Sequence, residues 1–114
     1  MKPIEHFYFD KEEPIASCLL ALKSIIINYN SDFEPRWYYG YPCFMYKNQV
    51  FCYLWVSKKT QHPYIAIGKG IKIEHPDLIQ GKRTFVKLLM IDPNKDIPIE
   101  KVHYIFDLAM ELYD

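Results

Sequence analysis

The chain has 114 residues, of which half are hydrophobic and a quarter are charged, and its 14 basic residues balance 14 acidic ones. This length is typical of one domain with its own core, and we take residues 1–114 as a single domain. The composition excludes a disordered chain, and the zero net charge gives no general attraction to nucleic acid or to an anionic membrane. The uncommon feature is an aromatic content of 17%, with ten Tyr and seven Phe.

The three cysteines, Cys18, Cys43 and Cys52, are odd in number and show no Cys-x-x-Cys spacing. A domain of this size does not need disulfides, so the sequence predicts three reduced thiols. The first residues lack the apolar stretch of a secretory signal, and the longest apolar run, Val50 to Val56, is too short to cross a bilayer. We therefore expect a cytoplasmic protein without a membrane partner.

Two segments have the hydrophobic period of an amphipathic helix, in which apolar residues recur every three or four positions. The first runs from Ile15 to Tyr29, and Pro14 suits its first turn because a missing N–H costs little there. The second follows the start signal Asp96-Ile97-Pro98. We expect helices near residues 13–30 and 98–113, each packing one apolar stripe onto the rest of the fold.

The middle of the chain predicts an antiparallel sheet of four to five strands, and with the two helices on one face this gives an α+β fold. We expect Asn48-Gln49 to form a two-residue turn and residues 76–80 to form a helical turn that ends at Gly81. The expected strands are Met45-Tyr46, Val50–Val56, Pro63–Gly68 and Thr84–Ile91.

Because side chains alternate across a sheet, this turn sorts the strands into two faces. The face expected under the helices is aliphatic and carries Cys43, Met45, Cys52, Leu54, Ile65 and Ile67. The other face is aromatic and carries Phe44, Tyr46, Phe51, Tyr53 and Trp55. In the next hairpin, Trp55 should lie opposite Tyr64 and Tyr53 opposite Ala66.

Small residues among large rings leave space, so the aromatic face predicts a ligand pocket floored by Ala66 and Gly68. Lys87 interrupts an apolar strand and needs a partner, which a ring, a tyrosine hydroxyl or a bound anion would supply. Two alternatives are cover by residues 70–82 of the same chain and cover by a homodimer partner. The predicted ligand-binding residues are Tyr46, Tyr53, Trp55, Tyr64, Arg83 and Lys87.

Catalytic and metal-binding motifs are sparse. The chain has no nucleophile elbow, Walker loop or dinucleotide-binding glycine turn, so nothing marks it as an enzyme, and the apolar neighbours of Cys43 and Cys52 favour inert thiols. One helical stripe could offer oxygen ligands to a hard cation, although a solvated helix face is the simpler interpretation. This stripe consists of Glu100, His103, Asp107 and Glu111.

Several short segments together resemble the YdhG-like family of domains of unknown function. They are residues 37–44, 51–55, 58–59, 63–65, 75–78, 81–83 and 96–98, with the aromatic-Gly-Tyr-Pro run at 39–42 the most specific. The resemblance implies an α+β fold with an antiparallel sheet and packed helices. It also implies a second function, because some relatives are described as frataxin-like iron chaperones for iron–sulfur cluster assembly.

These observations lead to one main functional hypothesis and two alternatives. The main hypothesis is a small binding domain that presents an aromatic groove, edged by Lys and Arg, to a small or anionic ligand. The alternatives are a frataxin-like iron chaperone, which would use iron at the stripe on the second helix, and a structural domain that self-associates.

Overall fold

The structure is a computed structural model that describes residues 2–113. Its helices are α1 (Pro3–Phe9), α2 (Ile15–Tyr29) and α3 (Ile99–Met110). Its strands are β1 (Glu34–Tyr38), β2 (Tyr41–Tyr46), β3 (Gln49–Val56), β4 (Pro63–Ile67), β5 (Leu78–Ile79) and β6 (Lys87–Met90), with a 3₁₀ turn at Gly70–Lys72. The six strands form one antiparallel sheet in the order β1-β2-β3-β4-β6-β5.

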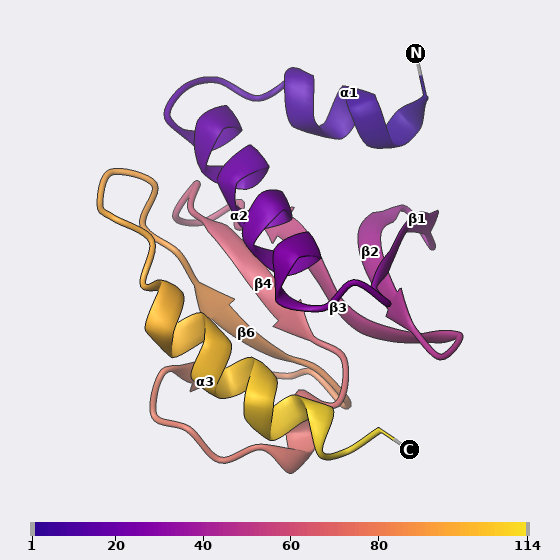
Figure 1. Cartoon of the computed structure of the whole chain (residues 1–114). Coiled ribbons are helices and arrows are strands. Elements are labelled where there is room, and N and C mark those ends of the chain that lie inside the picture. Colours follow the sequence, from indigo (N-terminus) through magenta and orange to yellow (C-terminus); the bar gives the residue numbers. More distant parts are fainter. Residues whose placement is uncertain (1, 114) are drawn as a thin grey trace.

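The helices α2 and α3 lie across one face of this sheet (Figure 1). Their buried residues recur every three or four positions, as the amphipathic pattern requires, and include Leu19, Leu22 and Ile26 on α2 and Val102, Phe106 and Ala109 on α3. The prediction of an α+β fold with these two helices on an antiparallel sheet is therefore confirmed. The sheet has six strands instead of four to five.

The strands that the sequence did not predict are the two at the edges, β1 and β5. β1 contains Pro35, which is disfavoured within sheets and is tolerated here because β1 pairs only with β2. β5 is only two residues long, and it replaces the helical turn expected at 76–80. The short helix α1 was also not predicted; it contacts α2, β1 and β2.

A bulge in the β2–β3 hairpin changes which side chains share a face. The turn is formed by Lys47 and Asn48, both with positive φ, and not by Asn48-Gln49. Met45 pairs with Val50 but Phe44 pairs with Cys52, so Phe51 is an extra residue in β3. Beyond the bulge, the strand face that a residue occupies is reversed relative to a regular hairpin.

This reversal corrects the predicted sorting of β2 and of Phe51. Phe44 and Phe51 are fully buried in the core under the helices, not on the aromatic face. Cys43 pairs with Tyr53 and therefore lies on the face away from the helices, and Met45 lies there as well. The sorting of β3 and β4 is confirmed, because Leu54 pairs with Ile65 and Cys52 with Ile67 on the helix side of the sheet.

All three cysteines are free thiols, as predicted. Cys43 and Cys52 lie on opposite faces of the sheet, and Cys18 is buried on α2. Within residues 2–113, every helix is too short or too polar to span a bilayer.

Candidate functional site

The sheet face turned away from α2 and α3, called the open face below, carries the aromatic residues of the central strands. Tyr53 pairs with Ala66 and Trp55 with Tyr64, as predicted from the sequence. In the neighbouring strand β6, Leu88 pairs with Ala66 and Met90 with Tyr64. Paired residues point to the same side of a sheet and residues alternate along a strand, so the open face includes Tyr41, Cys43, Met45, Val50, Tyr53, Trp55, Tyr64, Ala66, Leu88 and Met90.

Tyr41 is the centre of the aromatic packing on the open face. Its ring centroid lies 4.5 Å from that of Tyr53 and 4.9 Å from that of Trp55. Trp55 also stacks on Phe7 of α1, with the ring centroids 5.0 Å apart, so α1 helps to fix the indole. Tyr41 was not among the predicted site residues, because a regular hairpin would place it with Cys43 on the helix side. The bulge at Phe51 puts both residues on the open face instead.

A hollow of about 380 Å³ lies over one end of the open face, and we call it the basic hollow. Three cationic side chains contribute to its wall, those of Lys58, Lys59 and Arg83, and no Asp or Glu does so among residues 2–113. The other lining residues are Tyr41, Trp55, Val56, Ser57, Tyr64, Leu88 and Met90. The hollow therefore combines an aromatic and apolar base with a rim of one charge.

A second hollow of about 260 Å³, called the aromatic hollow, adjoins the first through Tyr41, which lines both. Its lining is nearly all apolar or phenolic and consists of Tyr38, Tyr39, Tyr41, Cys43, Val50, Tyr53, Gly68 and Val86. Gly68 is required at this point, because a Cβ added to it would lie 2.1 Å from the carbonyl oxygen of Val50. We refer to the two hollows together as the groove.

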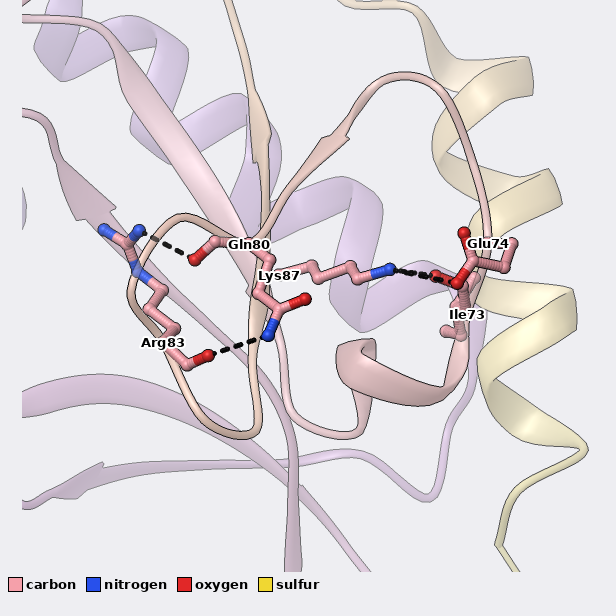
Figure 2. Close-up of polar contacts among 5 residues, drawn as sticks. All are labelled: Ile73, Glu74, Gln80, Arg83 and Lys87. Atoms are coloured by element: carbon pink, nitrogen blue, oxygen red, sulfur yellow. Dashed lines mark hydrogen bonds and ion pairs between the residues drawn. The ribbon is translucent and has the colours of Figure 1, made fainter.

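Arg83 is positioned by a compact loop between β5 and β6 (Figure 2). Its Nη1 donates to the Gln80 carbonyl oxygen at 3.4 Å, and the Gln80 side-chain Nε2 donates to the Arg83 carbonyl oxygen at 3.0 Å. Gly81 has φ +58°, a conformation that glycine adopts without strain. The guanidinium is thus held at the rim by its own loop and keeps further N–H groups for a ligand.

Tyr53 and Tyr64 of the groove are neutral hydrogen-bonding groups at physiological pH. Burial, and after it the neighbouring phenols Tyr64 and Tyr41, raise the pKa of Tyr53 to about 12. Burial also raises the pKa of Tyr64, while the nearby Arg83 guanidinium acts in the opposite direction. The phenol groups therefore stay protonated, and each can donate one hydrogen bond to a bound group.

Two of the predicted ligand-binding residues lie on the wrong face for the groove. Lys87 pairs with Ile67, so its side chain points to the helix side of the sheet. There its Nζ donates to the Ile73 carbonyl oxygen at 2.7 Å and lies 3.8 Å from the Glu74 carboxylate (Figure 2). Tyr46 also lies on the helix side, edge-on to the ring of Tyr113 at 5.9 Å. Tyr53, Trp55, Tyr64 and Arg83 do come together on the open face.

The predicted floor of the pocket is only partly right, and the segment considered as a cover for the aromatic face lies elsewhere. Ala66 is fully buried beneath Tyr64 and Leu88, so it supports the groove from below, whereas Gly68 does line it. The segment 70–82 does not form a second core on this face, because its Ile73 and Leu78 are buried in the core on the helix side.

The acidic stripe on α3 gives no cluster suited to a metal ion. The Asp107 carboxylate accepts a 2.6 Å hydrogen bond from the Tyr29 hydroxyl, and the His103 ring packs against the Tyr29 ring at 5.5 Å. Glu100 is exposed in the first turn of α3, and Glu111 is exposed just beyond its last turn. In the part of the chain that the structure describes, no group of three His, Cys, Asp or Glu side chains could hold one ion.

The thiols on the two sheet faces are poor nucleophiles at neutral pH. Burial raises the pKa of Cys43 to about 11. Its thiol donates to the Tyr38 carbonyl oxygen at 3.6 Å, a bond that only the protonated form can make. Burial raises the pKa of Cys52 well above its ordinary value. Both cysteines therefore remain in the thiol form, which is the unreactive one.

Comparison of the chain with models of protein families, with curated proteins and with solved structures gives no match. The resemblance to the YdhG-like family therefore stays a prediction. The chemistry of the groove has to be inferred from its own residues.

Proposed function

We propose that this chain is a binding domain that takes a small anionic ligand in the basic hollow of the groove. The observation that carries the proposal is the charge of the rim, where Lys58, Lys59 and Arg83 face the hollow together and no carboxylate of residues 2–113 lines it. Cations grouped in this way repel one another, and a bound anion relieves that repulsion.

The shape and polarity of the hollow support the same conclusion. A volume of about 380 Å³ falls within the range of roughly 300–1,000 Å³ common for small-molecule sites. The planar guanidinium of Arg83 suits phosphate or carboxylate oxygens, which it can bind with two parallel hydrogen bonds. The hydroxyls of Ser57 and Tyr64 supply neutral donors, while Trp55 offers an apolar surface to the rest of the ligand.

The proposal includes a reducing, cytoplasmic location. It rests on the three free cysteines, because secreted domains of this size commonly use such residues in disulfides. The absence of a metal cluster among residues 2–113 gives no support to iron binding at the α3 stripe.

Fluorescence of Trp55 offers a direct test, since the indole lines the hollow. In a Trp37→Phe background, which leaves Trp55 as the sole indole, inorganic phosphate and pyrophosphate should change the emission in a saturable way. Arg83→Gln should weaken binding by at least about tenfold, because hydrogen bonds to charged groups are worth roughly 1.5–3 kcal/mol. Lys58→Gln and Lys59→Gln should each weaken it less, since both lysines are exposed and flexible.

Lys72→Gln is the matched control, because Lys72 is an exposed lysine outside the groove. It should leave the affinity unchanged. A lack of any saturable response to both anions, or an equal loss in Lys72→Gln and Arg83→Gln, would contradict the proposal. Light scattering should show a monomer, and a dimer that dissociates when Tyr64 or Arg83 is replaced would favour the structural, self-associating domain instead.

A further inference from the structure

We infer that the ligand carries a planar aromatic ring besides its anionic group, as a nucleoside monophosphate does, and that the aromatic hollow binds the ring. This inference rests on the proposed function, since it assigns the anion to the basic hollow. It adds a second subsite, built by the turn between β1 and β2.

The two hollows are arranged for one ligand with two chemically different ends. Tyr41 forms a wall of both, and its ring contacts Tyr53 on the aromatic side and Trp55 on the basic side. One end of the groove is therefore cationic, and the other is apolar and phenolic. A ligand that spans Tyr41 would place its anion near Arg83 and its ring near Tyr38 and Tyr39.

Tyr39 is the residue that points most clearly to a ring-binding role. It has φ 52° in the turn before Gly40, whose φ is 80°, and the residue is 84% exposed. Asn and Gly are the residues that favour such a turn, and a bulky side chain there is strained. Among residues 2–113, its ring contacts that of Tyr38 alone, with the centroids 4.4 Å apart. A strained and exposed aromatic residue adds little to folding, so its ring is explained better by a ligand that stacks on it.

The remaining lining favours a flat, largely uncharged partner. Val50, Val86 and Gly68 contribute apolar surface, and none of the described side chains that line the aromatic hollow is charged. Aromatic side chains stack on nucleobases through their faces and tolerate any base. At the other end, three cations suit a phosphate dianion better than a single carboxylate. A nucleoside monophosphate has both ends in one small molecule.

Isothermal titration with matched ligands separates the two subsites. Adenosine and uridine 5′-monophosphate carry ring and phosphate, and ribose 5-phosphate carries the phosphate alone. We expect the nucleotides to bind more tightly than the sugar phosphate by at least about fivefold, the lower end of what one base stack contributes. Tyr39→Asn should remove most of this advantage, leave the affinity for ribose 5-phosphate unchanged, and keep or raise the melting temperature because Asn suits the turn. Tyr104→Ala, which removes an exposed ring from α3, should change neither affinity.

The results that overturn the inference differ from those that overturn the proposed function. If ribose 5-phosphate binds as tightly as both nucleotides, or if Tyr39→Asn leaves nucleotide affinity intact, there is no ring subsite, although the anion site stands. If neither nucleotide nor ribose 5-phosphate binds, the proposed function fails as well. If a six-residue oligouridylate binds far more tightly than uridine 5′-monophosphate, the groove serves single-stranded nucleic acid and the small-ligand inference is wrong.

Discussion

The Lys87 ammonium donates a 2.7 Å hydrogen bond to the Ile73 carbonyl oxygen, on the side of the sheet opposite the groove. The sequence suggested a bound anion as one partner for this buried cation. In the structure the partner is the chain itself, because the segment after β4 returns beneath β6 and brings Ile73 and Glu74 to the lysine. Lys87 therefore belongs to the stability of the fold.

Replacing Lys87 by Met should separate stability from binding. Lys87 is only 7% exposed, and Met matches its side chain as far as Cε but leaves the Ile73 carbonyl without its donor. An unsatisfied buried acceptor costs about 1–3 kcal/mol, which urea denaturation would measure as a lower free energy of unfolding. Phosphate affinity should be unchanged. Lys82→Met, on an exposed residue of the preceding loop, should alter stability by less than about 0.5 kcal/mol. A loss of anion binding in Lys87→Met would mean that Lys87 does contribute to ligand binding.

Leu54→Ala tests which face of β3 the helices cover. Leu54 is fully buried opposite Ile65, so truncation should cost about 2–5 kcal/mol of unfolding free energy. Leu20→Ala, at an exposed position of α2, should cost far less, and the pair can be compared by urea denaturation. Equal effects of the two substitutions would mean that the helices do not pack on this face.

Gly68→Ala should disturb the pairing of β3 and β4 at the end of β4, where Gly68 lies beside the start of β3. The Gly68 N–H donates to the Phe51 carbonyl oxygen at 2.9 Å, and this close approach leaves a new Cβ only 2.1 Å from the Val50 oxygen. The strands would have to move apart, so we expect a loss of more than about 1 kcal/mol in thermal or urea denaturation. Gly40→Ala keeps space around the new methyl group and should show only the cost of its positive φ. A stable Gly68→Ala protein would show that the two strands are further apart.

Alkaline pH should destabilise the protein, because buried thiol and phenol groups would have to lose their protons. The pKa of Cys43 rises from an ordinary value of 9.0 to about 11, and those of Tyr53 and Tyr113 rise from 10.0 to about 12. Each of these groups loses its proton at a lower pH in the unfolded chain than in the folded one. Their contribution to the free energy of unfolding is therefore fully present below pH 9 and falls as pH rises from about 9 towards 12. Chemical denaturation across this range would show the decline in the free energy of unfolding. Cys43→Ala should make this decline smaller between pH 9 and 11.

The same burial predicts slow reaction of the native thiols. Cys18, Cys43 and Cys52 should react slowly with a thiol reagent at pH 7.5 and quickly after denaturation, because the buried thiols stay protonated and shielded. Ellman titration with and without urea measures both rates. Rapid native labelling of Cys43 would instead indicate an accessible, reactive thiol beneath the groove.

The helices and the β3–β4 pairing could be read from the sequence because each is set by a strong local pattern. The period of three and four defines α2 and α3, and the alternation of Leu54 and Trp55 against Ile65 and Tyr64 leaves one consistent register.

The bulge at Phe51 could not be read in this way. One extra residue reverses the faces of everything beyond it, and nothing in the run Val50-Phe51-Cys52 distinguishes a bulged strand from a regular one. Tyr41 was missed and Tyr46 was wrongly included for this reason. Lys87 was misplaced because the face of β6 depends on its pairing with β4, which is a contact between distant parts of the chain. Arg83 was predicted to lie near the groove because it alternates in step with Lys87. In the structure its position is set by the hydrogen bonds of its own loop.

The strand order has a consequence for solubility, because a sheet with two free edges can recruit strands from other molecules. One edge is β5, whose two residues offer almost no length for such pairing. The other is β1, where Pro35 lacks an N–H to donate, and where Glu34 and Arg36 hold charges in a 3.0 Å ion pair. Short length at one edge, and proline with charge at the other, oppose edge-to-edge aggregation. The chain can therefore keep a sheet rich in Tyr, Phe and Trp without its strands extending into fibrils.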